Sequence, residues 1–165
     1  MKVIFLDVDG VLTSEDYLNG VEFDLSEEKI KLLKKIVEQT NAKIVLSSSW
    51  KNKTRNFPVL ENLLNKNDLE IYDTTPEIKR IRKINHKYMD LPIVNIDSKR
   101  GEEINKWVLD HNPESFVILD DNLHNFDKFD LDKHLVQTNY YDGGLKEEHV
   151  EKALEILNNK KKKLR

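Results

Sequence analysis

Short apolar runs alternate along this chain with longer segments in which apolar residues recur every three or four positions. The spacing in the longer segments predicts amphipathic helices. One begins after Ser26, a second covers 59–64, a third begins at 99–100, and a terminal helix ends near Leu157. The apolar runs predict strands buried on both faces, at residues 3–6, 43–46, 69–72, 116–119 and 134–138. Because strand, helix and strand follow one another from the start of the chain, we predict a βαβ unit within a three-layer α/β fold whose sheet is mainly parallel.

Two stretches do not follow this alternation. Residues 11–25 are polar and are predicted to be irregular, with a turn at Asn19–Gly20. Residues 77–98 have no assigned element and are too long for a simple connection, so we expect a segment that covers a functional site. The basic residues within 79–87 are interpreted as the solvated face of a helix, with contact to a nucleic-acid or nucleotide phosphate as the alternative.

Three of the predicted strands end in polar side chains. Asp7 and Asp9 follow the first strand and precede a glycine. Three serines at 47–49 follow the second strand, and Asp120 and Asp121 follow the fourth. Because the carboxyl ends of parallel strands lie along one edge, where open α/β sheets bind ligands, we expect these side chains to share a site.

The residue types at this edge predict its chemistry. Carboxylates gathered in one place repel each other unless a cation lies among them, and oxygen ligands suit Mg²⁺. Serine hydroxyls and a basic residue at the start of a helix add a phosphate site. Asp7 or Asp9 would then act as a nucleophile and the other as a proton donor. These motifs contain no histidine, which argues against a histidine-based phosphatase.

Composition limits the other classes of protein. Acidic and basic residues nearly balance, at a net charge of -3, so a protein that wraps broadly around nucleic acid is not expected. The chain has no cysteine, which excludes disulfides and thiolate metal sites. Neither a signal-peptide pattern nor an apolar run of membrane-spanning length is present, so we expect a cytoplasmic protein with no membrane partner. We expect one domain over 1–158 and a basic tail over 159–165.

The order of these motifs resembles the haloacid dehalogenase (HAD) superfamily. It runs from Asp-x-Asp-Gly at 7–10, through a strand that ends in serine and a basic residue that opens a helix, to Asp-Asp at 120–121. The resemblance covers residue 2 to about residue 157 and implies a Rossmann-like HAD fold. The stretch between the first two motifs has room for one loop and one helix, so no large cap domain is expected. The Arg-Gly-Glu-Glu-Ile at 100–104 resembles small HAD domains associated with nucleic-acid repair and phage genomes.

The resemblance implies a role for each acid. Asp7 would form an aspartyl-phosphate. Asp9 would be the general acid and then the base that activates water, and its main-chain carbonyl would be a ligand of Mg²⁺. Asp121 would be a direct Mg²⁺ ligand, with Asp120 either a ligand or a neighbour of one. The presence of Asp9 implies hydrolysis of phosphate esters, because HAD dehalogenases, phosphonatases and transport ATPases lack this second aspartate.

Two motif positions stay open at this point. The family has one Ser or Thr after its second strand, and we favour Ser48, with Ser47 as the alternative. Members of the family have a lysine at the third motif, where this chain has Lys99 followed by Arg100. Either side chain would neutralise the phosphate, arginine as a bidentate clamp and lysine as a point charge.

Substrate contacts are expected just beyond the second strand. Lys51 and Arg55 would flank the pocket, with plain surface charge as the alternative. Trp50 would stack on a base, although packing into the core is the favoured interpretation. His124, shortly after the acidic pair, is interpreted as a solvated loop residue, with a position near the site as the alternative.

These inferences predict a Mg²⁺-dependent phosphomonoesterase that acts through an aspartyl-phosphate. Its partner would be a phosphorylated small molecule, a nucleotide or a phosphorylated nucleic-acid end. The alternative is a HAD-fold binding protein that sequesters a nucleotide or signalling nucleotide without turnover. A receiver domain is disfavoured, because serines follow the strand where a receiver carries its phosphorylated aspartate.

Overall fold

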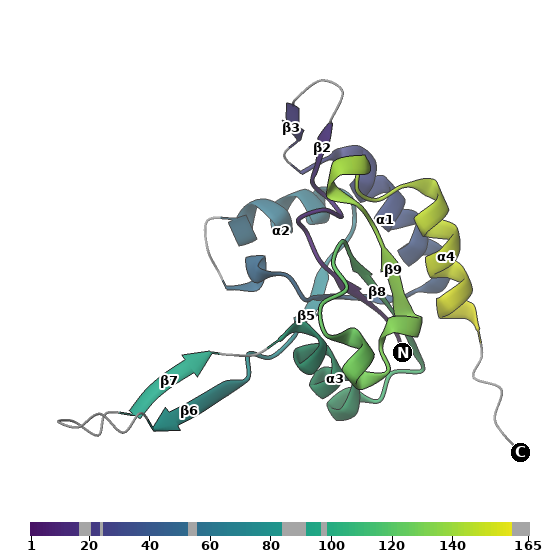
Figure 1. The fold of residues 1–165 in the computed structure, drawn as a ribbon. Coiled ribbons are helices and arrows are strands. Elements are labelled where there is room, and N and C mark those ends of the chain that lie inside the picture. Colours follow the sequence, from purple (N-terminus) through teal and green to yellow (C-terminus); the bar gives the residue numbers. More distant parts are fainter. Residues whose placement is uncertain (17–20, 24, 53–55, 84–91, 97–98, 160–165) are drawn as a thin grey trace, which may run out of the picture.

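A five-stranded parallel sheet is the centre of the molecule (Figure 1). The computed structural model describes residues 1–16, 21–23, 25–52, 56–83, 92–96 and 99–159. The strand order is β5-β4-β1-β8-β9, and β1 is paired in parallel with β4 on one side and β8 on the other. The bounds are β1 (Lys2–Leu6), β4 (Lys43–Leu46), β5 (Ile71–Thr74), β8 (Ser115–Asp120) and β9 (Leu135–Gln137).

Both faces of the sheet are covered. Alternate residues of β1 pack into two different clusters, with Ile4 and Leu6 in one and Val3 and Phe5 in the other, and all four are fully buried. The first cluster lies under α1 (Glu27–Thr40), α2 (Asn56–Lys66) and α4 (Glu147–Asn158). The second lies under α3 (Arg100–His111) and the short 3₁₀ helix η2 (Phe126–Phe129). The expected three-layer α/β fold is therefore confirmed, as is the absence of a large cap among the described residues.

Left-handed asparagines end two of the helices that lead into central strands. Asn41 follows α1 with φ 54°, and Asn112 follows α3 with φ 45°. Asparagine tolerates this conformation better than most residues, and it lets the chain turn sharply into β4 and β8. The third strand is present, but it begins two residues later than the predicted 69–72. Leu69 is instead buried at the turn out of α2, where its N–H donates to Leu64 O at 3.0 Å, and β5 begins only at Ile71.

The prediction of an irregular segment at 11–25 was also wrong. The carbonyl of Val8 accepts the N–H groups of residues 11, 12 and 13, which forms one helical turn directly after β1. The short strands β2 (Ser14–Asp16) and β3 (Val21–Phe23) then pair antiparallel. Strands of three residues give too little alternation for a sequence pattern to register, while the Asn19–Gly20 turn lies outside the described residues.

A second antiparallel hairpin replaces the helix expected within 79–87. Its strands are β6 (Lys79–Lys83) and β7 (Pro92–Ile96), and in Figure 1 it projects away from the sheet. Residues 84–91, which include the rest of the basic run, lie outside the described residues. Arg80 donates to Glu102 of α3 at 2.5 Å, so an ion pair joins the hairpin to the helix.

The remaining regular elements of the described ranges are three short 3₁₀ helices in the connections. They are η1 (Ser49–Lys51), η3 (Asp132–His134) and η4 (Tyr140–Asp142). None of the helices in the described ranges has the length and apolar content needed to cross a membrane. The basic tail expected over 159–165 falls outside the described residues from 160 onwards.

Gly10 allows the turn after β1 to approach the loop after β8, and its replacement should be costly. Gly10 has φ +79°, and a Cβ there would lie 2.2 Å from Asp121 Oδ2. Gly143 has φ +82°, but its Cβ would meet nothing closer than Lys146 Cε at 3.4 Å. We expect Gly143→Ala to lose about 1 kcal/mol of unfolding free energy from backbone strain, and Gly10→Ala about 2–4 kcal/mol, because it must also displace Asp121. Urea denaturation measures both, and equal losses would contradict the close packing of these two loops.

Candidate active site

Asp7 lies at the centre of the sheet edge. Its N–H donates to Leu119 O at 2.9 Å, and the N–H of Ser47 donates to Leu6 O at 2.9 Å. These bonds extend the parallel ladder one residue beyond the strands, which places Ser47, Asp7 and Asp120 side by side on three neighbouring strands. The expectation that these strand ends share one edge is therefore confirmed by the topology.

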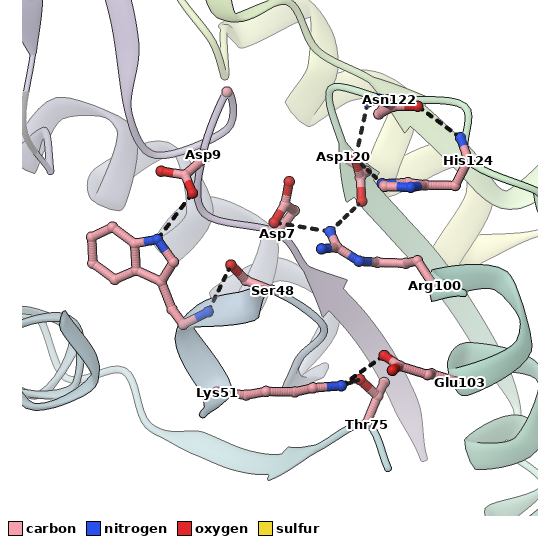
Figure 2. Close-up of polar contacts among 12 residues, drawn as sticks. Asp7, Asp9, Ser48, Lys51, Thr75, Arg100, Glu103, Asp120, Asn122 and His124 are labelled. Atoms are coloured by element: carbon pink, nitrogen blue, oxygen red, sulfur yellow. Dashed lines mark hydrogen bonds and ion pairs between the residues drawn. The ribbon is translucent and has the colours of Figure 1, made fainter. Parts of the chain in front are cut away.

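Arg100, the first residue of α3, joins two of the acids. Its Nη1 lies 3.0 Å from Asp7 Oδ1 and 2.9 Å from Asp120 Oδ2 (Figure 2). The side chain is largely buried, and burial alone would lower the pKa of Arg100, but the two carboxylates raise it above its ordinary value. Lys99 precedes it as the exposed N-cap residue of α3. The structure thus brings Arg100 rather than Lys99 into contact with Asp7.

Three carboxylates form a compact cluster beside this arginine. Asp7, Asp120 and Asp121 each offer an oxygen, and these oxygens all lie within 4.8 Å of one another. Burial, together with the charge of Asp120, raises the pKa of Asp7 to about 6, although Arg100 acts in the opposite direction. The same two causes raise the pKa of Asp121. Crowded carboxylates with raised pKa values are the setting that a divalent cation relieves.

Asp120 is the most fully bonded acid of the cluster. It has no exposed surface, and its Oδ1 accepts from the N–H of Asn122 at 2.9 Å and lies 3.1 Å from His124 Nε2. Since its Oδ2 contacts Arg100, Asp120 holds the loop after β8 as well as the arginine. The favoured interpretation of His124 as a solvated loop residue was wrong, and this contact fits the alternative that His124 lies near the site. Its spacing four residues after Asp120 was a signal in the sequence that could have suggested the contact.

Asp9 lies outside the carboxylate cluster. Its side chain is exposed, and its Oδ2 accepts a hydrogen bond from the indole Nε1 of Trp50 at 3.0 Å (Figure 2). The Trp50 ring is half-buried and packs against the core cluster on the α1 side of the sheet. The favoured interpretation of core packing therefore described part of the environment of Trp50, but it missed the bond to Asp9.

The serines after β4 differ in their bonding. Ser47 and Ser48 are both almost fully buried. Within the part of the chain that the structure describes, Ser47 Oγ is a buried polar atom without a hydrogen-bond partner. Ser48 Oγ accepts from the N–H of Trp50 at 3.3 Å and caps η1, which leaves its own O–H to donate. Ser47 thus has an unused hydroxyl at the same edge as Asp7.

A cavity of about 470 Å³ opens next to these groups, between η1, the start of α3 and the loop after β8. Lys51 lies within it, but its Nζ is bonded to Glu103 Oε2 at 2.6 Å and to Thr75 Oγ1 at 3.0 Å. Both charged side chains are less than one-tenth exposed, so they form a buried ion pair rather than free surface charges. Arg55, the other expected substrate contact, lies outside the described residues. The described lining is Ser47, Ser48, Ser49, Lys51, Asn52, Glu77, Lys99, Arg100, Glu103, His124 and Asn125.

The raised pKa of Asp7 predicts how the metal-free protein depends on pH. Asp7 takes up a proton more readily when folded than when unfolded, so the neutral form stabilises the fold at low pH, and this contribution is lost as pH rises toward about 6. Asp7→Asn should therefore be more stable than wild type at pH 7.5 in EDTA. The gain should reach at most about 3 kcal/mol, which corresponds to a pKa of about 6 in place of 3.8.

Urea denaturation in EDTA at pH 7.5 and pH 4.5 measures this difference. The advantage of Asp7→Asn should shrink at the lower pH, because the wild-type carboxyl is then protonated. Asp110→Asn removes an exposed carboxylate that pairs with Lys106 and serves as the control. A difference that is the same at both pH values would contradict the assignment to Asp7.

The comparison with protein families agrees with this arrangement. Residues 3–150 match the family described as the HAD domain in Swiss Army Knife RNA repair proteins. The matched range includes both acidic motifs, the serines and the basic residues at the start of α3. No curated protein and no solved structure matches the chain. Since the family match covers most of its length and the fold is that expected of a HAD domain, the chain belongs to the HAD domain family of Swiss Army Knife RNA repair proteins.

Proposed function

We propose that this protein is a Mg²⁺-dependent phosphomonoesterase that forms an aspartyl-phosphate on Asp7. The observation that carries the proposal is the setting of Asp7, which is buried at the central strand end, close to Asp120 and Asp121, and is joined to Asp120 by the guanidinium of Arg100. Such a carboxylate is held in one place and faces a fixed positive charge. These are the requirements for attack on an anionic phosphate group.

The residues present fit a Mg²⁺ ion. Oxygen atoms of Asp7, Asp120 and Asp121 converge, and burial together with the negative charge of Asp120 raises the pKa of Asp7 and of Asp121. We assign the ion to Asp7, Asp121 and the main-chain carbonyl of Asp9, with Asp120 as a further ligand or a support for Arg100. When bound, Mg²⁺ neutralises these carboxylates and polarises a phosphate oxygen.

Asp7 and Asp9 have different roles in a reaction of two steps. In the first step an Asp7 oxygen attacks phosphorus, the bond to the ester oxygen breaks, and Asp9 donates a proton to the leaving alcohol. In the second step Asp9 takes a proton from a water molecule whose oxygen attacks phosphorus. The Asp7–phosphorus bond breaks and inorganic phosphate leaves. Arg100 stays protonated throughout and offsets the negative charge that the phosphate brings.

The serines and Arg100 supply donors to the phosphate. Ser47 has an unused O–H, and Ser48 has an O–H that remains free to donate while its oxygen caps η1. We therefore assign both hydroxyls to phosphate binding, with Ser47 as the main donor. Lys99, exposed at the mouth of the cavity, is assigned to the more distant part of the substrate.

The substrate is proposed to be a phosphorylated nucleic-acid end or a nucleotide. The family to which the chain belongs is described by RNA repair, and repair chemistry requires the removal of phosphate from strand ends. The cavity beside Arg100 is lined almost entirely by polar and charged side chains, as suits a ribose and its phosphates rather than an apolar alcohol.

The two serines should respond differently to replacement. Ser47→Ala removes a buried hydroxyl that has no partner, so the free energy of unfolding should stay within about 0.5 kcal/mol of wild type or rise. Ser48→Ala removes the η1 cap and should cost about 1 kcal/mol. Phosphatase activity should fall by about tenfold or more in Ser47→Ala, the more stable variant. A loss of stability in Ser47→Ala that equals the loss in Ser48→Ala would contradict this assignment.

Activity is tested with Mg²⁺ and a panel of 3′-phosphorylated and 5′-phosphorylated RNA oligonucleotides, mononucleotides and 4-nitrophenyl phosphate. We expect release of inorganic phosphate by wild type and a loss of about a thousandfold or more in Asp7→Asn, because no other group replaces the nucleophile. Asp110→Asn, far from the strand ends, should retain full activity. Wild type that releases no phosphate but retains a tightly bound nucleotide would instead support the sequestering protein.

A further inference from the structure

The chain has two tryptophans, and each donates its indole N–H to an aspartate. Trp50 Nε1 donates to Asp9 Oδ2 at 3.0 Å, and Trp107 Nε1 donates to Asp73 Oδ2 at 2.6 Å. Trp107 belongs to α3 and is almost fully buried in the core, and its partner Asp73 lies on β5, outside the acidic motifs. Trp50 differs because its aspartate belongs to the reaction assigned above. The indole of Trp50 therefore has a task that packing alone does not explain.

Trp50 is itself held firmly. Its N–H donates to Ser48 Oγ, which starts η1, and its ring packs against the core cluster beneath α1. Trp50 belongs to η1, and its indole Nε1 donates to Oδ2 of Asp9, the bond that Figure 2 draws at the labelled Asp9. An exposed aspartate would otherwise rotate freely about its side-chain bonds. Here one of its two oxygens is fixed by a donor that the backbone and the core keep in place.

The bond also favours one oxygen of Asp9 as the carrier of the proton. An indole N–H donates and never accepts, so the oxygen that it faces acts as an acceptor in both protonation states of Asp9. Because a carbonyl oxygen accepts more strongly than a protonated hydroxyl oxygen, the bond to Oδ2 favours the neutral acid that carries its proton on Oδ1. Among the described residues, Trp50 is the hydrogen-bond partner of this carboxyl group, and Oδ1 is left for the substrate.

We propose that Trp50 is a positioning residue that directs Oδ1 of Asp9 at the leaving oxygen and then at water. The inference rests on the proposed function, since it concerns the proton steps of that reaction. As the bond from phosphorus to the ester oxygen breaks, the Oδ1 proton passes to that oxygen. In the second step Oδ1 receives a proton from the attacking water. The effect is faster cleavage of esters of weakly acidic alcohols, such as ribose hydroxyls, because their leaving group depends on a delivered proton.

Hydrolysis of two phosphate esters of similar size distinguishes a positioning role of Trp50 from a purely structural role. Benzyl phosphate has a weakly acidic leaving alcohol, whereas 4-nitrophenyl phosphate leaves as a stable anion and needs little protonation. In Trp50→Phe, which keeps most of the ring packing, kcat for benzyl phosphate should fall about tenfold more than kcat for 4-nitrophenyl phosphate. KM for both should change little. Trp107→Phe removes the other indole–carboxylate bond and should leave the ratio of the two kcat values as in wild type.

The outcomes distinguish this proposal from the function on which it rests. If Trp50→Phe lowers both kcat values equally, or neither, the positioning role is wrong while Asp7-dependent hydrolysis of 4-nitrophenyl phosphate still stands. If wild type hydrolyses neither ester, both proposals fail.

A readout without turnover tests the contact itself. In ¹⁵N-indole NMR spectra, the signal that disappears in Trp50→Phe identifies Trp50. Asp9→Ala should shift that signal and leave the signal of Trp107 in place, because Trp107 keeps its bond to Asp73. A Trp50 signal that Asp9→Ala does not move would overturn the proposal.

Discussion

The buried carboxylate of Asp7 is the constraint around which the site is built. Burial and the neighbouring Asp120 both oppose its ionisation, and they raise its pKa to about 6. Arg100 offsets this only in part, with a single nitrogen shared between Asp7 and Asp120. The folded chain therefore retains an unfavourable concentration of charge at its central strand end. Proteins keep such groups where their chemistry is needed, since stability alone would select an apolar residue.

The parallel sheet provides a rigid backbone directly next to these charged side chains. Hydrogen bonds from the N–H groups of Asp7 and Ser47 continue the ladder, so the functional residues begin where a rigid backbone ends. The helices on both faces bury residues 3–6 of β1 and leave the carboxyl edge as its open boundary. Side chains at that edge are held by the fold at fixed separations, which is what positioning of a phosphate requires.

The sequence predicted the elements of the core better than the connections. Apolar runs such as 43–46 are long enough to specify a strand, and the common edge of parallel strands then brought Asp7, Ser47 and Asp120 together without further assumption. The hairpin of β2 and β3 was missed because strands of three residues are too short to show an alternation of apolar and polar residues. The hairpin of β6 and β7 was missed because four of the five residues of β6 are charged, which hides this alternation.

The individual contacts within the site were harder to predict. That Arg100 rather than Lys99 contacts Asp7 depends on where α3 begins, and a boundary of one residue is below the precision of a sequence pattern. The bond from Trp50 to Asp9 joins residues 41 apart in the sequence, and nothing local to either residue indicates it. The pairing of Lys51 with Glu103 joins residues 52 apart, so it too becomes visible only in three dimensions.

That buried pair has a mechanical consequence. Lys51 ends η1, the turn that carries Trp50, and Glu103 lies one helical turn after Arg100 on α3. Their ion pair joins the segment that carries Trp50 to the helix that carries Arg100. The pair therefore restrains the separation of η1 and the start of α3, which line opposite parts of the cavity.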